Sequence, residues 1–131
     1  MSERLEALDL SYRLIWHEGQ LEAVMAGVAE DFEWVVPGIP DEPMRRGPDE
    51  VRAFFLDWMN EFDDLAVEWD LEDVDDTRVI AYIRMQGVGR ASGVPIDMRY
   101  VQVFTYDEND VAKRMELYLD PAEGRRAVGL A

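Results

Sequence analysis

The stretch from Tyr12 to Gly38 changes its hydrophobic period twice, and this change strongly limits the folds open to the chain. Apolar residues before Gly19 recur at helical spacing, and a glycine suits the left-handed end of a helix. Residues 21–28 carry a second short helical stripe. From Phe32 to Val36 the apolar residues alternate with others, which is typical of a strand. The opening therefore predicts a helix, a short helix and a strand that enters a loop over 37–48.

Helical spacing returns once more and then gives way to alternation. Gly47-Pro48-Asp49-Glu50 predicts a helix start, because proline suits the first helical position and acids suit the first turn. The stripe of this helix runs from Val51 to Phe62. Alternation then predicts strands over 67–71, 78–91, 95–106 and 111–119, and Asp120-Pro121 opens a short helix that ends at Gly129. This order predicts an α+β protein, a curved antiparallel sheet wrapped on helices, in one domain over residues 1–131.

The two central strands carry apolar side chains on both faces. On 78–91, Val79 and Ile83 lie on one face, and Ile80 and Tyr82 on the other. A sheet that is apolar on both faces must be packed against other structure on each of them. We expect helices on one face and a second subunit on the other, which predicts a homodimer packed sheet on sheet.

The composition limits which kinds of molecule this protein is expected to bind. The chain has 29 acidic and 13 basic residues, a net charge of −16, which would repel nucleic-acid phosphates; we interpret it as a solubilising surface. It has no cysteine for disulfides or thiolate metal sites. No apolar run approaches the ~20 residues of a membrane span, and the N-terminus lacks a signal-peptide core, so we expect a cytoplasmic protein with no membrane contact. The acidic clusters lack calcium-loop spacing. We predict neither a metal nor a cofactor.

Four short blocks in this order resemble the ketosteroid isomerase-like superfamily, also called nuclear-transport-factor-2-like (NTF2-like) or SnoaL-like. They are x-G-x-L-E-A after the first helix, A-x-D-F-x-W at the first strand, G-P-x-x-V-x-x-F-F in the third helix, and the final Y-L-D-P. The resemblance covers nearly the whole chain. It implies a cone-shaped fold with a pocket for a small hydrophobic molecule between the curved sheet and the helices.

Strand parity predicts which residues line this implied pocket. Val67, Trp69 and Leu71 face inward because their neighbours are charged, and carrying the alternation across the sheet adds Phe104 and others. A slip of one residue would invert the set of any strand. The expected ligand-binding residues are Trp16, Trp34, Val36, Phe54, Phe55, Trp58, Trp69, Tyr82, Gln86, Tyr100, Met115 and Leu117. The four tryptophans fit either a core or the walls of such a pocket.

The resemblance to the steroid isomerases implies three catalytic groups. Tyr12 matches their helix-one tyrosine, and Gln102 falls where they carry a protonated acid, so it still donates a hydrogen bond. Val36 falls at the position of their base and cannot take a proton. Steroid isomerisation by that mechanism is therefore not expected. Tyr12 either orients a carbonyl or enolate oxygen, or is a core tyrosine whose hydroxyl meets Gln102 or water.

Arg84 is the third catalytic candidate, because it lies mid-strand on the expected pocket face. A buried guanidinium needs a partner. That partner is either a ligand anion or a carboxylate, for which Asp31, Glu33 and Glu116 are the candidates. With the opposite register, Arg84 would lie at the dimer surface.

Two other chemistries of similar proteins find incomplete matches. Limonene-epoxide hydrolases use an Arg and two Asp around a water; Asp97 and Arg99 are present, but Leu117 occupies the position of the second Asp. We therefore interpret Asp97 and Arg99 as a surface or interface ion pair. SnoaL-type cyclases carry a catalytic His on a strand, whereas His17 follows a helix and suits its negative end.

Three hypotheses follow. The first is a cofactor-independent isomerase, cyclase or dehydratase acting on a hydrophobic carbonyl compound, with Tyr12, Arg84 and Gln102 around the oxygen. The second is a binding module that does not catalyse a reaction. The third is a dimerisation domain with a filled core.

Overall fold

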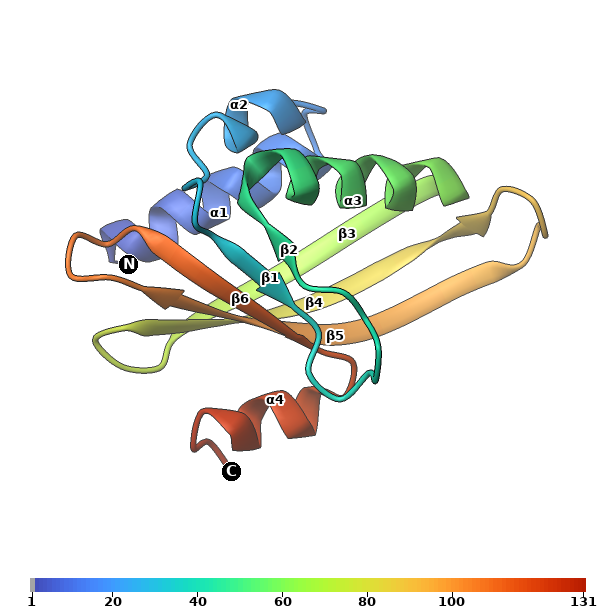
Figure 1. Ribbon diagram of the computed structural model, residues 1–131. Helices are drawn as coiled ribbons and strands as arrows, with labels where there is room; N and C mark the ends of the chain where they lie inside the picture. The colour runs from blue at the N-terminus through green and yellow to red at the C-terminus, as the bar shows by residue number, and fades with distance from the viewer. Residues whose placement is uncertain (1) are drawn as a thin grey trace.

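A six-stranded curved sheet forms the centre of the fold, with helices on both of its faces. The computed structural model describes residues 2–131. In Figure 1, α1, α2 and α3 lie on one face of the sheet and α4 lies on the other. We call these the inner face and the outer face. The helices are α1 (Glu3–Trp16), α2 (Leu21–Met25), α3 (Gly47–Glu61) and α4 (Pro121–Ala127). The strands are β1 (Glu33–Val35), β2 (Arg45–Arg46), β3 (Phe62–Asp73), β4 (Arg78–Gly89), β5 (Pro95–Tyr106) and β6 (Ala112–Tyr118).

The chain caps α1 at both ends through local sequence. The Ser2 side chain accepts a hydrogen bond from the Leu5 amide at 3.2 Å, which satisfies one free N–H of the first turn. Gly19 has φ +64, the left-handed conformation in which a glycine commonly ends a helix. The Gln20 amide donates back to the Leu14 carbonyl at 2.7 Å. The predicted end of the first helix at Gly19 is thus confirmed.

α3 begins and ends abruptly. Its Gly47 has φ +77, and a side chain there would meet the Glu30 carbonyl oxygen at 2.9 Å, so glycine is required. Pro48 follows at the first turn. At the other end, Phe62 is extended and opens β3 directly. Phe62 was predicted to lie on the helical stripe, with the strand beginning later; this is wrong because no loop separates the two elements.

The strands follow the order β2-β1-β6-β5-β4-β3. All pairs are antiparallel except β1 with β6, which is parallel. The short strand β2 lies within the Pro- and Gly-rich segment predicted to be a loop, where it pairs with β1. The α+β class and the curved sheet on helices are confirmed. No helix within residues 2–131 is both long and apolar enough to cross a membrane.

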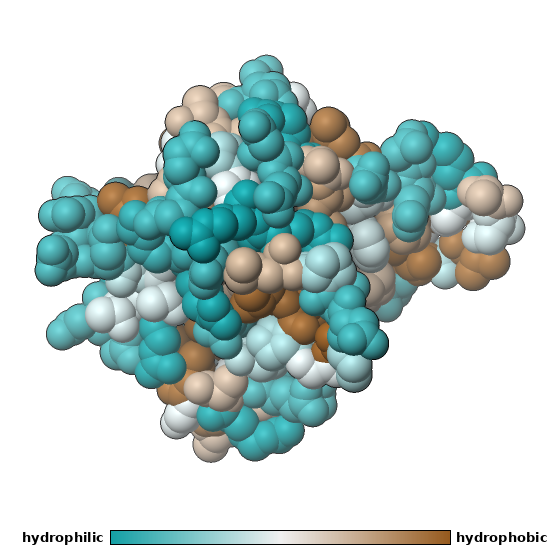
Figure 2. Space-filling view, viewed as in Figure 1, coloured by the Kyte–Doolittle hydropathy of each residue, from teal (hydrophilic) through white to brown (hydrophobic). Residues whose placement is uncertain are grey.

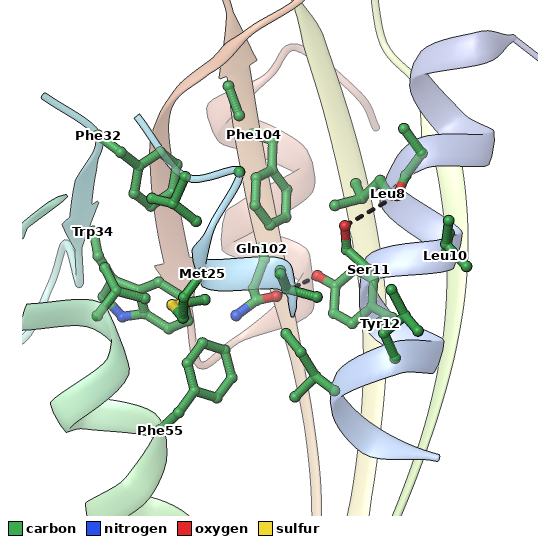
Figure 3. A pocket seen from close by; sticks show the side chains of 18 of the residues that line it. Leu8, Leu10, Ser11, Tyr12, Met25, Phe32, Trp34, Phe55, Gln102 and Phe104 are labelled. Carbon is green, nitrogen blue, oxygen red and sulfur yellow. Dashed lines mark hydrogen bonds between the residues drawn. The ribbon is translucent and has the colours of Figure 1, made fainter. Parts of the chain in front are cut away.

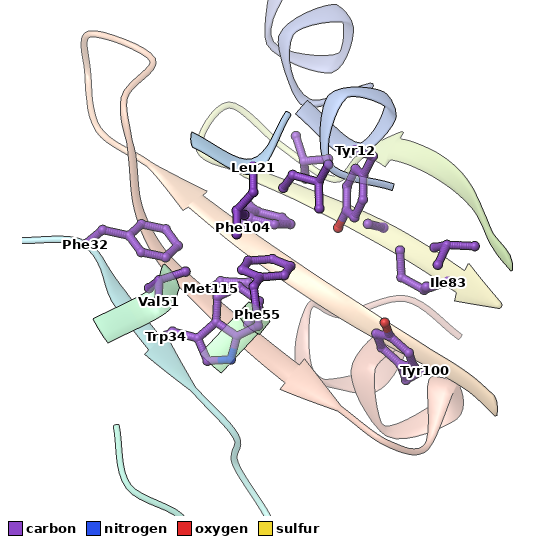
Figure 4. Close-up of a cluster of buried hydrophobic side chains, with 14 of the residues drawn as sticks. Tyr12, Leu21, Phe32, Trp34, Val51, Phe55, Ile83, Tyr100, Phe104 and Met115 are labelled. Atoms are coloured by element: carbon purple, nitrogen blue, oxygen red, sulfur yellow. The ribbon is translucent and has the colours of Figure 1, made fainter. Parts of the chain in front are cut away.

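The core lies between the inner face and helices α1–α3 (Figure 4). Trp69 of β3 pairs with Ile83 of β4, which pairs in turn with Tyr100 of β5, so these three side chains share the inner face. The inward face of β4 is therefore Val79, Ala81, Ile83 and Met85. The opposite parity was predicted for this strand, which is wrong. Both faces of β4 are apolar near its start, so the alternation alone did not decide between them.

On the outer face, α4 covers the apolar residues of the central strands. Ile80, Val101 and Val103 form a small second core with Val128, which follows α4. Gly124 of α4 lies so close to Val101 that a side chain there would overlap it. Part of the apolar surface that was assigned to a second subunit is therefore buried within the chain. The homodimer stays a prediction.

Candidate functional site

A cavity of about 450 Å³ lies between the inner face and the helices (Figure 3). This volume is within the usual range for small-molecule sites. Helices α1 and α2 with the turn after α2, helix α3, and strands β1, β4 and β5 all contribute to its wall, and the β5–β6 hairpin borders one end. The lining is mostly aromatic and aliphatic. Of the residues in the described chain that line it, only Arg4 and Asp110 carry a formal charge.

Two buried polar side chains meet inside this apolar wall. The Tyr12 hydroxyl of α1 donates a hydrogen bond to Gln102 Oε1 of β5. Tyr12 is 6% exposed and Gln102 is 6% exposed. A buried polar group costs stability unless it is paired, so this contact fixes both side chains.

Aromatic neighbours hold the Tyr12 ring in place. Trp69 stacks on it with the ring centres 5.5 Å apart, and Phe104 meets it edge-on at 6.4 Å. The Trp69 indole N–H donates to Asp9 Oδ1 at 2.8 Å, which anchors the stack to α1. The His17 ring also packs against Trp69, with the ring centres 4.8 Å apart.

The Tyr12 hydroxyl stays protonated at neutral pH. Burial raises the pKa of Tyr12 well above its usual 10.0, and the nearby hydroxyls of Tyr100 and Tyr106 raise it further. Tyr12 can therefore donate a hydrogen bond but is not a general base. Because its hydrogen points to Gln102, it acts on the cavity through that amide.

The amide nitrogen of Gln102 is the donor that this pair presents to the cavity. In Figure 3 it points away from Tyr12, toward the space between Met25 and Phe55. Within residues 2–131 it makes no hydrogen bond, and it is not sealed off from open space as Trp34 Nε1 and Arg4 Nε are. An amide N–H needs an acceptor. The arrangement suits a carbonyl or hydroxyl oxygen of a bound molecule.

The structure brings about half of the predicted site residues to the cavity. The predicted residues that line it are Tyr12, Trp16, Trp34, Phe55, Trp58, Tyr100 and Gln102. Four others lie in the inner core without lining the cavity, namely Phe54, Trp69, Met115 and Leu117. Val36 follows the end of β1 and does not reach the cavity.

Arg84, Tyr82 and Gln86 do not belong to this site. They lie on the outer face, because the parity assigned to β4 was inverted. Arg84 instead pairs with Asp97, with Nη2 2.9 Å from Oδ2, and this contact lowers the pKa of Asp97. Tyr82 meets Glu72 and Arg125, also away from the cavity. The ion pair predicted between Asp97 and Arg99 is thus replaced by one between Asp97 and Arg84.

Two of the carboxylates predicted as partners for Arg84 bind other basic side chains instead. Asp31 accepts a hydrogen bond from Lys113 at 2.9 Å, and Glu33 accepts one from Arg114 at 2.8 Å. His17 Nε2 lies 3.3 Å from the Val67 carbonyl oxygen and does not line the cavity. No cluster of three or more His, Asp or Glu side chains suited to a metal ion occurs in the part of the chain that the structure describes.

The part of the cavity wall that is built by α2 and the turn after it was not predicted from the sequence. Val24, Met25 and Val28 were recognised as a helical stripe but were not assigned to the pocket, although all three line it. Met85 was missed through the β4 parity. The stripe was the available signal, since a short helix over the open side of the inner face must turn its apolar side toward the sheet.

Comparison with known proteins places this geometry in a wider group. No curated protein matches the chain in sequence. An NTF2-like protein of unknown function from Burkholderia pseudomallei is similar in structure, with a TM-score of 0.76 and 22% identity over 98% of this chain and 99% of that chain. A candidate SnoaL-like polyketide cyclase from Jannaschia sp. gives a TM-score of 0.75 and 16% identity over 98% of this chain and 92% of that one.

A third similar structure contains a ligand. A Mycobacterium tuberculosis protein in complex with estradiol-17beta-hemisuccinate has a TM-score of 0.71 and 18% identity over 89% of this chain and 93% of that one. At these identities the similarity shows the fold. The family assignment comes from the sequence model of the SnoaL-like domain, which matches residues 10–114. This chain therefore belongs to the SnoaL-like domain family.

Proposed function

We propose that this protein binds a neutral, hydrophobic small molecule that carries a carbonyl group, with the carbonyl oxygen accepting a hydrogen bond from Gln102 Nε2. The observation that carries the proposal is the free amide donor inside an apolar cavity of about 450 Å³. A cavity of this kind favours a ligand with one acceptor on an apolar skeleton. The neighbour from M. tuberculosis, whose ligand is an estradiol ester, supports a ligand with a hydrophobic ring skeleton.

Tyr12 completes the anchor by polarising the amide. Its donated hydrogen bond draws electron density toward Gln102 Oε1, which strengthens the N–H donors on the same amide. In a cavity with few other polar groups, this small network decides the orientation of the ligand. Both groups are neutral, so the site favours a neutral carbonyl over an anion.

Binding can be tested with 1-tetralone and its hydrocarbon analogue tetralin. Tryptophans in the wall give a fluorescence signal, since Trp16, Trp34 and Trp58 line the cavity. Gln102→Leu is expected to weaken 1-tetralone binding about three- to tenfold, the value of one neutral hydrogen bond, while tetralin binding stays the same. Gln86→Leu, the same change on the outer face, serves as the control. Equal affinity of wild type and Gln102→Leu for 1-tetralone would exclude the amide as the anchor.

A second candidate function is carbonyl chemistry of the isomerase, cyclase or dehydratase type. The specific observation in its favour is the Tyr12–Gln102 network, because polarising a carbonyl makes the adjacent C–H more acidic. Against it, the lining contains no carboxylate near Gln102 that could remove the proton. Deuterium exchange at the carbon next to the 1-tetralone carbonyl, followed by NMR, separates the two functions. Exchange that is faster with wild type than with Tyr12→Phe supports an enzyme. Exchange with wild type that is no faster than in buffer alone supports binding without catalysis.

We also propose that a second copy covers the part of the outer face that α4 leaves open. Exposed charged pairs there, such as Arg84 with Asp97, and the partly buried Tyr82 suit an interface of mixed character. Figure 2 shows a mainly hydrophilic surface with small apolar patches. Sedimentation equilibrium gives the mass in solution, and a monomer at all concentrations would contradict this proposal.

A further inference from the structure

A second free polar group lies on the same strand as Gln102. Tyr100 of β5 is 8% exposed and lines the cavity, and its ring hydroxyl makes no hydrogen bond to any residue from 2 to 131. In Figure 4 this hydroxyl points into the space between the sheet and the helices. It differs from Trp34 Nε1, which is sealed off without a partner. A buried hydroxyl that faces open space can bind a ligand or a trapped water.

The strand fixes how the two groups are arranged. Tyr100 and Gln102 are two residues apart, so both face inward and follow each other along the sheet wall of the cavity. A strand rises by about 3.3 Å per residue, which separates their backbone positions by about 7 Å. Phe104, the next inward residue, shows that a ring without a hydroxyl is accommodated on this strand.

The Tyr100 hydroxyl is a neutral donor and acceptor. Burial raises the pKa of Tyr100 above its usual 10.0, and the same hydroxyl contributes to the raised pKa of Tyr12. The two tyrosine hydroxyls therefore lie within electrostatic reach of each other. Together with the Gln102 amide they give the cavity three neutral polar side chains, one on α1 and two on β5.

We propose that Tyr100 forms a second polar subsite, so that the preferred ligand is an elongated ring compound with a second oxygen about 7 Å from the carbonyl along the direction of β5. This inference rests on the function proposed above. The carbonyl accepts from Gln102 Nε2, and the second oxygen, a hydroxyl or another carbonyl, pairs with the Tyr100 hydroxyl. The Tyr100 hydroxyl thus distinguishes between hydrophobic carbonyl compounds that would bind equally well to the apolar wall alone.

The test compares 1-tetralone with 6-hydroxy-1-tetralone, whose added hydroxyl lies across the ring from the carbonyl-bearing carbon. In wild type the hydroxyl is expected to improve affinity about three- to tenfold. In Tyr100→Phe this improvement disappears, while 1-tetralone binds as before. Tyr118→Phe is the matched control and is expected to retain the improvement. The Tyr118 hydroxyl lies outside the cavity and donates a hydrogen bond to Glu116 at 2.8 Å. The same improvement in Tyr100→Phe as in wild type would overturn the subsite.

A measurement on the unmodified protein covers the case in which Tyr100→Phe does not fold. With labelled tyrosine, the Tyr100 ring signals are expected to shift more with 6-hydroxy-1-tetralone than with 1-tetralone, and equal shifts would contradict the proposal. Failure of the subsite is distinguishable from failure of the proposed function. If Gln102→Leu weakens both ligands and Tyr100→Phe changes neither, only the subsite is wrong. If Gln102→Leu changes neither ligand, the carbonyl anchor itself is wrong, and the subsite that depends on it falls with it.

Discussion

Removing the Tyr12 hydroxyl should destabilise the protein through Gln102. In Tyr12→Phe, the stack on Trp69 and the edge contact with Phe104 remain, because both involve the ring. What is lost is the hydrogen bond to Gln102 Oε1. The Trp69 indole cannot replace it, since its N–H already donates to Asp9. The amide oxygen is then left without a partner in an apolar wall.

An unpaired buried acceptor costs about 1–3 kcal/mol. With a urea m-value of about 1–3 kcal/mol/M, the unfolding midpoint should fall by about 1 M. Gln102→Leu should have a cost of the same order, because it leaves the Tyr12 hydroxyl unpaired instead. The double variant removes both polar groups, so its cost should be clearly smaller than the sum of the two single costs.

Urea unfolding followed by tryptophan fluorescence measures all four free energies of this cycle. We expect a coupling energy of about 1–2 kcal/mol between the two sites. Tyr118→Phe combined with Gln102→Leu is the control pair, and its costs should add. Additive costs for Tyr12→Phe and Gln102→Leu, within about 0.5 kcal/mol, would refute the paired network on which the site is built.

Three further changes test the packing of α4, the hydrogen bonds between Arg78 and Asp75, and the burial of the Tyr12 hydroxyl. Gly124→Ala should push α4 away from Val101 and destabilise the protein by about 1–3 kcal/mol in urea unfolding, whereas Arg126→Ala on the exposed side of α4 should have little effect; equal costs would contradict the close packing. Hydrogen bonds from Arg78 lower the pKa of Asp75 from 3.8 to about 2, so this carboxylate stabilises the fold above pH 4 and its contribution is lost as the pH falls toward 2. Asp75→Asn should therefore be less stable than wild type at pH 7, with the difference closing between pH 4 and 2; a difference that stays constant would refute this. Because burial raises the pKa of Tyr12 above 10.0, folding favours its neutral form, and stability measured by thermal melting should fall as the pH rises beyond 10. Tyr12→Phe should reduce this alkaline loss, and an unchanged loss would argue against a buried hydroxyl.

The sequence predicted the elements well where local signals were strong. Pro95 and the hairpin before Val111 bound β5, and the predicted strand over 95–106 matches the observed one. The helix over Gly47 and the cap at Asp120 carry proline and acid signals that act within a few residues, and the Asp120 side chain accepts from the Ala122 amide at 2.9 Å. Such signals need no knowledge of the tertiary structure.

The site could be predicted only in part, because its residues depend on long-range choices. The parity of β4 was wrong since Ile80 and Ile83 are equally apolar and only their covers differ, α4 for the first and α1–α3 for the second. Tyr12 and Gln102, ninety residues apart, were found through the resemblance to the steroid isomerases. Whether a cavity exists at all depends on how completely side chains fill the space, and alternation does not report this.

The proposed function depends on the free amide of Gln102, which is expected to hold a carbonyl oxygen inside the cavity. The most direct measurement is the side-chain NH₂ signal of Gln102 in a nitrogen-15 NMR spectrum during titration with 1-tetralone and, separately, with tetralin. We expect a downfield shift of one Gln102 amide proton with 1-tetralone and little change with tetralin, while Gln86 on the outer face stays constant in both. A Gln102 signal that does not respond when 1-tetralone fills the cavity would show that this amide does not bind the carbonyl.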